Sequence, residues 1–284
     1  MPDVSVSKVA IVKGQDASDM TVKALEMVDA AEAVSTEKPV LIKPNYVTTD
    51  HPSTGITTDS RVIEGVVAFL RQHDVKEIII GEGTGFGDTF DAFKIAGVNE
   101  VAERWKVRML DLNKDEFVEI NPPRPLALRK VKIAKTALGS TIVSLPKLKP
   151  HRWAGVTLSL KNMMGAVTPK GSMHVRLSEK IVDLASIIGP SVAVIDGIIA
   201  GEGHETSGNP VEMNLVIAGT DPVAVDAIGA AVMGICPESV KHLRLADETG
   251  LGTCRLERIQ ILGEPVEKVK KKFRTSFVTK VLRI

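Results

Sequence analysis

The chain has 284 residues, of which 44% are hydrophobic and 4% aromatic, and 36 Lys and Arg against 35 Asp and Glu give a net charge of +1. This composition is typical of globular proteins and excludes a disordered or collagen-like chain. The two cysteines, Cys236 and Cys254, form no CxxC pair, so we expect reduced thiols and neither a disulfide framework nor a thiolate-bound zinc or iron–sulfur site within one chain.

Short β-branched runs alternate with helical patterns along most of the chain. We predict strands at residues 9–12, 40–43, 78–81, 107–110, 141–145, 192–196, 215–218 and 259–262. We predict helices at residues 18–33, 60–73, 88–96, 179–188, 221–233 and 238–248. This alternation predicts an α/β fold, with a mostly parallel sheet and helices on both faces, as a single domain over residues 1–263.

Two segments depart from the alternation. Residues 112–176 contain several prolines and few helix signals, and no carboxylate lies between Glu119 and Glu179, where eleven Lys and Arg residues occur. We predict an irregular cationic insert here, with a small subdomain as one option. Residues 264–284 are predicted to form a basic amphipathic tail, with a frayed helix, a docking helix and a dimer element left open.

Polar residues and glycines follow two of the predicted strands. Lys43 and Asn45 lie at the end of the strand 40–43, where a parallel sheet presents its ligand-binding edge. Gly81 and Gly83 belong to a glycine-rich loop that fails the GxGxxG spacing, so we predict close backbone approach either to a ligand or to a neighbouring strand. Glu82, between these glycines, is a candidate base or metal ligand.

The densest group of cations and histidines lies between residues 146 and 174. It contains Lys147, Lys149, His151, Lys161, Asn162 and His174, interleaved with apolar residues. We predict that the lysines, together with Lys43, hold a phosphate or carboxylate ligand, although pairing with the acidic remainder of the chain is the alternative. In the ligand hypothesis Asn45 and Asn162 orient the ligand, and the histidines transfer protons.

Two carboxylates complete the candidate site. Asp196 ends the strand 192–196, and Asp226 is surrounded by apolar residues on every side of the helix 221–233. A carboxylate buried in this way needs a cation or a hydrogen-bond donor. We predict that one or both steer a histidine or lysine of the site, with a structural ion pair as the alternative.

The order of these motifs resembles a known family. The motifs are Lys43-Pro44-Asn45, Thr57-Thr58, Pro146-Lys147-x-Lys149-x-His151, Thr157-x-x-x-Lys161-Asn162-x-x-Gly165, His174, Asp196-Gly197 and Asp221-Pro222-x-x-x-Asp226. They look like the family called domain of unknown function 362, over roughly residues 8–263. Many members of that family carry a ferredoxin-like module with two iron–sulfur clusters, which implies redox work for those members. Two isolated cysteines cannot supply eight ligands, so this chain is expected to lack the clusters.

A second similarity concerns His151, Lys161 and His174. Their order is similar to the cofactor segment of nickel-dependent lactate racemases, in which a lysine holds an organic nickel cofactor and histidines flank it. This similarity implies an isomerase that exchanges hydride or protons at a hydroxy-acid carbon.

Three hypotheses follow for the function. The first is an enzyme of the oxidoreductase or isomerase class that binds a small anionic molecule, its cofactor unidentified. The second is an accessory binding or electron-transfer protein whose cationic face docks an acidic redox partner. The third is metal binding by His174, Asp183, Asp196, Glu202 and His204, which lack a fixed ligand spacing.

The sequence also limits the partners and the cellular location. The chain has no nucleic-acid-reading motif and is nearly neutral overall, so we expect no nucleic-acid partner. It shows no signal peptide and no apolar run of about 20 residues, so we expect no membrane insertion and a cytoplasmic location. A homodimer is left open.

Overall fold

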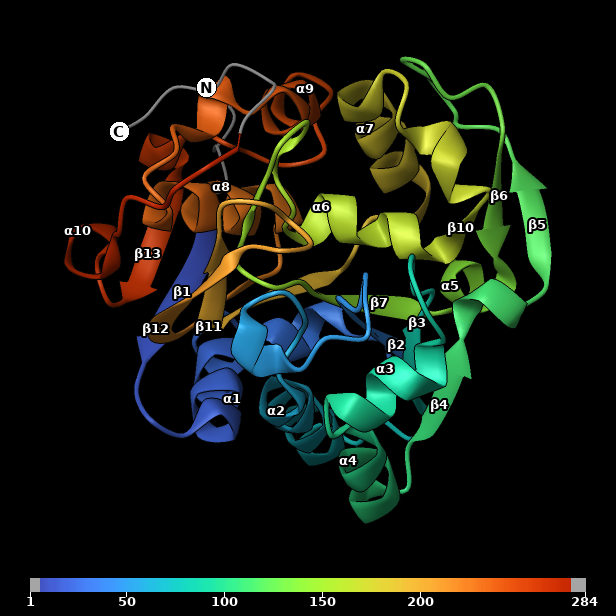
Figure 1. The fold of residues 1–284 in the computed structure, drawn as a ribbon, viewed down its shortest axis with the longest axis horizontal. Helices are drawn as coiled ribbons and strands as arrows, with labels where there is room; N and C mark the ends of the chain where they lie inside the picture. Colours follow the sequence, from blue (N-terminus) through green and yellow to red (C-terminus); the bar gives the residue numbers. More distant parts are fainter. Residues whose placement is uncertain (1–5, 277–284) are drawn as a thin grey trace.

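An eight-stranded sheet separates two layers of helices in the computed structural model, which describes residues 6–276 (Figure 1). Across the sheet the strands are β13 (Ile259–Gly263), β1 (Ser7–Lys13), β12 (Asn209–Gly219), β11 (Val192–Glu202), β7 (Thr141–Leu145), β2 (Val40–Pro44), β3 (Ile78–Glu82) and β4 (Arg108–Asp111). Every neighbouring pair is parallel except the two pairs that include β12. The predicted mostly parallel α/β fold is confirmed.

Alternation along each strand sends side chains into two separate cores. In β1, Val9 and Ile11 join the core on one face, whereas Ala10 and Val12 join the core on the other. The second face is covered by α1 (Ala17–Met27), α2 (Ser60–Gln72), α3 (Thr89–Ile95) and α4 (Val98–Trp105). The first face is covered by α5 (Lys135–Gly139), α6 (Ser159–Asn162), α7 (Leu177–Ile188), α8 (Pro222–Val232), α9 (Lys241–Glu248) and α10 (Val266–Val269).

The strands β11 and β12 are longer than the sequence indicates. The apolar run 192–196 predicts a strand that ends at Asp196, yet β11 continues to Glu202 and pairs with β12 as far as Asn209. The ladder accommodates a register shift between Gly197 and Ile199. Because only residues 203–208 connect the two strands, β12 must return antiparallel to β11.

Residues 112–176 do not form one continuous insert. β7 lies inside this segment and occupies the middle of the main sheet, between β2 and β11. The part before it contains β5 (Phe117–Ile120) and β6 (Val131–Ala134), which pair with β10 (Val167–Thr168) in a small antiparallel sheet. The part after it contains the short hairpin of β8 (Pro150–His151) and β9 (Gly155–Val156), followed by α6.

The basic tail packs against the domain as far as it is described. Val266, Val269 and Phe273 are buried in the same core as α8. The amide of Phe273 donates to Met233 O at 3.2 Å, and Arg274 Nε lies 2.6 Å from Glu202 Oε1. The rest of the predicted tail, residues 277–284, lies outside the described residues. Between residues 6 and 276, no helix has both the length and the apolar character that crossing a membrane requires.

Candidate functional site

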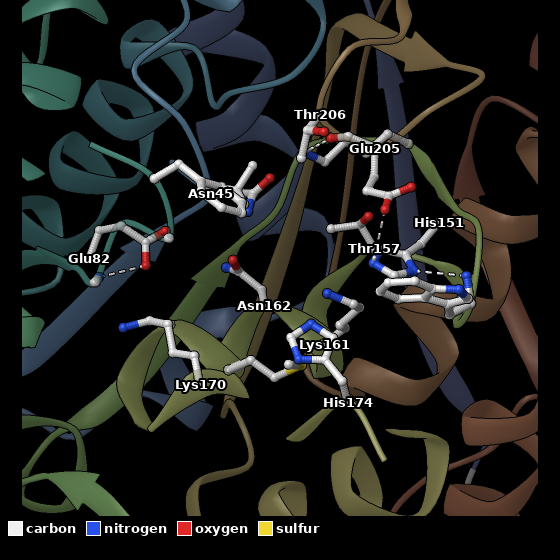
Figure 2. Close-up of a pocket in the computed structure, with 18 of the residues that line it drawn as sticks. Asn45, Glu82, His151, Thr157, Lys161, Asn162, Lys170, His174, Glu205 and Thr206 are labelled. Atoms are coloured by element: carbon white, nitrogen blue, oxygen red, sulfur yellow. Dashed lines mark hydrogen bonds and ion pairs between the residues drawn. The ribbon is translucent and has the colours of Figure 1, made fainter. Parts of the chain in front are cut away.

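A cavity of about 540 Å³ opens at the carboxyl ends of β2 and β3 (Figure 2). From β2 the chain proceeds to β3 and β4 on one side of the sheet and later returns to β7 on the other side. The junction of β2 and β7 is therefore a topological switch point, where open α/β sheets bind their ligands. The cavity wall is completed by the hairpin of β8 and β9, by α6 and by the loop 203–208.

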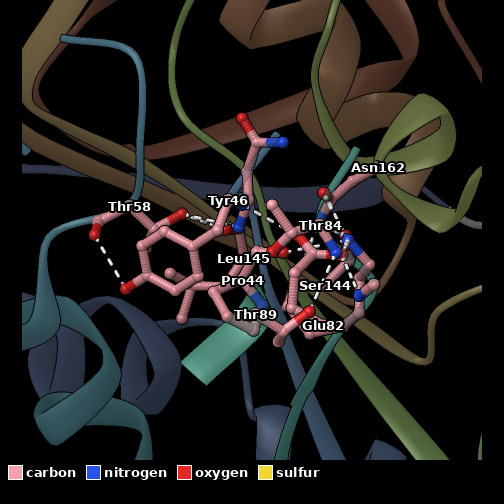
Figure 3. A network of polar contacts seen from close by, with 12 residues as sticks. Pro44, Tyr46, Thr58, Glu82, Thr84, Thr89, Ser144, Leu145 and Asn162 are labelled. Carbon is pink, nitrogen blue, oxygen red and sulfur yellow. Dashed lines mark hydrogen bonds and ion pairs between the residues drawn. The ribbon is translucent and has the colours of Figure 1, made fainter. Parts of the chain in front are cut away.

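A buried ion pair forms the floor on the β2 and β3 side. Lys43 Nζ lies 2.6 Å from Glu82 Oε1 and 3.0 Å from Asn162 Oδ1, and Lys43 is only 1% exposed. Glu82 also accepts hydrogen bonds from the amides of Tyr46 and Gly83 (Figure 3). Burial lowers the pKa of Lys43, and the neighbouring Glu82 carboxylate opposes this shift. Lys43 therefore has its counter-charge, the Glu82 carboxylate, inside the protein.

The two glycines predicted to contact a ligand differ in position. Gly83 lines the cavity, and a Cβ there would collide with the carbonyl oxygen of Gly165. Gly165 in turn passes so close to the ion pair that a Cβ would collide with Glu82. Gly81 instead packs against Leu41 inside the sheet and does not line the cavity, so a direct ligand contact by Gly81 is not favoured.

Lys161 is the cation that the cavity leaves unpaired. It lies on α6 with its amine directed into the cavity, and it makes no hydrogen bond or ion pair with any residue of the described range 6–276 (Figure 2). Burial lowers the pKa of Lys161 to about 8; Glu205 opposes this shift, and Lys43 adds to it. Because no described residue contacts this amine directly, a hydrogen-bond partner for it must come from a ligand or from solvent.

Asp226 supports α6 from behind and does not line the cavity. Its carboxyl oxygens accept hydrogen bonds from the amides of Ser159, at 2.7 Å, and Leu160, at 2.9 Å. These are amides of the first turn of α6, which have no partner within the helix. Burial raises the pKa of Asp226 to about 8. Asp226, predicted to act in the site, therefore caps the helix that carries Lys161 and lies outside the cavity lining.

His151 contributes a neutral imidazole. Its Nδ1 accepts hydrogen bonds from the amides of Trp153, at 3.2 Å, and Ala154, at 3.1 Å, so the ring proton belongs on Nε2. Nε2 lies 3.8 Å from Glu205 Oε1. Burial, together with the charge of Lys161 and other nearby cations, holds the pKa of His151 far below its ordinary value.

Glu205 and the residues beside it form the opposite wall and the rim. The side chain of Glu205 pairs with Arg152 Nε at 3.0 Å, and the guanidinium of Arg152 lies 4.3 Å from the ring centroid of Trp153. The Trp153 ring meets the exposed ring of His174 edge to face, at 5.8 Å between centroids. The predicted proton-transfer residue His174 therefore borders the cavity at its rim.

Lys147 and Lys149, the two remaining lysines of the predicted anion site, lie in different places. Lys149 lines the cavity, where its Nζ donates to the backbone oxygens of Ile56 and Glu205, and burial lowers its pKa to about 7. Lys147 lies outside the cavity and pairs with Asp196 at 2.6 Å, with both side chains fully buried. Asp196 also accepts from the backbone amide of Asp59. Lys147 and Asp196 thus form the structural ion pair that was the alternative for Asp196.

The carboxylates of the metal hypothesis do not converge. Asp183 accepts three backbone hydrogen bonds, from residues 126–128, while Glu202 pairs with Arg274. Within residues 6–276 no three His, Cys, Asp or Glu side chains gather as metal ligands would.

Lys170 and Glu205 line the cavity, although the sequence prediction gave them no role. Lys170 donates to Asn113 Oδ1. Thr157, which belongs to the family motif, lies beside His151 (Figure 2). Asn45, predicted from its position at the end of the strand 40–43, lines the cavity, and its buried Oδ1 has no hydrogen-bond partner within the described part of the chain. Glu205 occurs in a glycine-flanked loop, which is the one sequence signal that could have indicated it.

The comparison with known proteins identifies a family. Residues 40–231 match the family described as domain of unknown function 362. The chain belongs to this family. A relative is the thylakoid-associated protein sll1697 of Synechocystis sp., which is 24% identical over 241 residues, covering 81% of this chain and 74% of that protein. The predicted family is confirmed, and neither description names a reaction.

Proposed function

We propose that this family member is an enzyme that binds a small anionic organic molecule in the cavity and transfers protons or hydride on it. The observation that carries the proposal is the unpaired amine of Lys161. The described lining contains five Lys and Arg side chains against the two carboxylates Glu82 and Glu205. This surplus of positive charge in a concave site favours a carboxylate or phosphate ligand.

The other polar groups suit proton transfer on such a ligand. The Nε2–H of His151 can donate a hydrogen bond to an oxygen that gains negative charge during reaction. Glu205, 3.8 Å from this nitrogen, can accept a proton. The unpartnered Oδ1 of Asn45 can accept from a hydroxyl or amino group of the ligand.

The accessory-protein hypothesis has less support. A docking face needs cations that a partner protein can reach, yet Lys43 and Lys149 are at most 2% exposed. Lysines that are buried to this extent can contact only a molecule that is small enough to enter the cavity. The relative's name associates that protein with thylakoids and names no ligand, so the cytoplasmic location of this chain stays a prediction.

A hydroxy-acid isomerase is the second candidate. His151, Lys161 and His174 all border one cavity, as the similarity to lactate racemases requires. The donor set does not fit a metal ion held directly by side chains, because no three metal-ligating groups converge within the described residues.

Thermal-shift titration with acetate, lactate, pyruvate, 2-oxoglutarate and phosphate tests the proposal. We expect at least one of these anions to raise the Tm of the wild-type protein, and Lys161→Met to abolish the shift. Lys23→Met is the matched control, because Lys23 is exposed on α1 and does not line the cavity. No shift for any anion, or an equal shift in all three proteins, would refute the proposal.

A further inference from the structure

We propose that Lys161 is an amine nucleophile that forms an imine with a 2-oxo acid, or with another small carbonyl compound that bears an anionic group. This inference rests on the proposed function, because it names the ligand class of the same cavity. The inference goes beyond the proposed function because it assigns a covalent step to the side chain of Lys161.

The first observation is that Lys161 differs from the other lysines of the cavity. Lys43 pairs with a carboxylate, Lys149 donates to two backbone carbonyls and Lys170 donates to a side-chain amide. Lys161 makes none of these contacts with residues 6–276. Its nitrogen can therefore approach a bound molecule without breaking an existing hydrogen bond.

The second observation is the surroundings of the Lys161 amine. It lies in the cavity wall, where burial lowers its pKa; the Glu205 carboxylate opposes this shift, and the ammonium group of Lys43 adds to it. Desolvation and an adjacent cation are the two conditions that activate lysines as nucleophiles toward carbonyls. With a pKa of about 8, a substantial fraction of the amine is neutral under mildly basic conditions.

The third observation concerns the rest of the ligand. The remaining cavity cations, Lys149, Lys170 and Arg152, can hold a carboxylate or phosphate group while the carbonyl carbon faces Lys161. The cavity volume of about 540 Å³ is that of a small-molecule site. A 2-oxo acid places an anionic group directly beside a reactive carbonyl.

The step balances without an oxidant or a reductant. The neutral amine attacks the carbonyl carbon and forms the C–N bond, while the electron pair of the C=O bond moves to oxygen. That oxygen takes up a proton, and the Nε2–H of His151 can stabilise it by hydrogen bonding. The nitrogen loses its two protons overall, the C–O bond breaks, and the products are the imine and one molecule of water.

Reductive trapping tests the inference. The full-length protein is incubated with pyruvate or 2-oxoglutarate and cyanoborohydride, and then analysed by intact mass and peptide mapping. We expect an adduct equal to the 2-oxo acid less one oxygen atom, located at Lys161. Lys161→Arg keeps the cation and should lose the adduct, whereas Lys23→Arg, on the exposed face of α1, should keep it.

The outcomes separate this inference from the proposed function. Lactate lacks the carbonyl, so a Tm shift by lactate without any adduct from either 2-oxo acid would overturn the imine and leave the proposed function intact. No Tm shift and no adduct would overturn both. An adduct that maps to other lysines of the wild-type protein would also overturn the inference, and this readout does not depend on whether Lys161→Arg folds.

Discussion

Replacing Lys161 by methionine is expected to stabilise the fold while it removes anion binding. Methionine has a similar length and carries no charge, so it fits the same wall without an unpaired ammonium group. The charge of Lys161 is present for the ligand and disfavours the ligand-free folded state, which is the trade-off between stability and activity that functional sites show.

The magnitude follows from the pKa of Lys161, which falls from its ordinary value of 10.5 to about 8 in the folded protein. A shift of this size corresponds to roughly 3 kcal/mol at most. Because the side chain is partly exposed to the cavity, solvent screening reduces this figure. We expect Lys161→Met to raise the free energy of unfolding near neutral pH by about 1–3 kcal/mol.

The pH dependence has a definite sign. Between about pH 8 and 10.5 the lysine of the unfolded chain stays protonated while that of the folded protein loses its proton. The unfolded state then binds more protons, so the stability of the wild-type protein rises with pH across this window. Lys161→Met lacks this gain, and its advantage over the wild-type protein should shrink toward zero near pH 10.5.

Urea denaturation of both proteins, near neutral pH and near the upper end of this window, measures the effect. All other titrating groups are common to the two proteins, so their difference isolates Lys161. Lys23→Met, an exposed control on α1, should change stability by about 0.5 kcal/mol or less at either pH. A less stable Lys161→Met protein near neutral pH, or a difference that does not vary with pH, would refute the reasoning.

Three further predictions concern the cavity and its support. Lys147→Met should lower the free energy of unfolding by about 3–5 kcal/mol in urea denaturation, because it leaves a buried carboxylate without its cation; a loss below about 1 kcal/mol would contradict this. Gly165→Ala should lower both the Tm and the Tm shift caused by anions, because its Cβ would collide with Glu82. Gly139→Ala, whose Cβ meets open space, should resemble the wild-type protein, and equal behaviour of the two variants would contradict the close approach. The affinity for lactate in calorimetry should fall as the pH rises through about 8, where Lys161 loses its charge, and a pH-independent affinity would count against this role.

The sequence was sufficient to place the sheet and the edge that carries the site. The strand 141–145 has the same bounds in the structure, because a short β-branched run between polar turns has few alternatives. The continuation of β11 through Gly197 and Gly201 could not be predicted, because glycines in a run normally indicate a loop. Its pairing with β12, a contact between distant residues, overrides that local preference.

Part of the candidate site could also be predicted from the sequence. Lys43 lies at the end of β2, and His151 and Lys161 lie in the segment that follows β7. The ends of these two parallel strands meet at one edge of the sheet, and all three residues line the cavity. Lys147 and Lys149 are equivalent in the sequence, yet one pairs with Asp196 behind the cavity and the other lines it. Residue type gives no information on the direction of a side chain in an irregular segment, and that direction separates a structural cation from a binding cation.

The most direct test of an unpaired cation in the cavity is an NMR titration of the Lys161 ε-amine in the free protein and with a saturating small carboxylate. We expect a pKa near 8 in the free protein, because burial and Lys43 disfavour the ammonium form. A bound carboxylate should raise this pKa, because it pairs with the charged form. A pKa near 10.5 in the free protein, unchanged by any of the anions, would contradict the assignment of Lys161 as the ligand-binding cation.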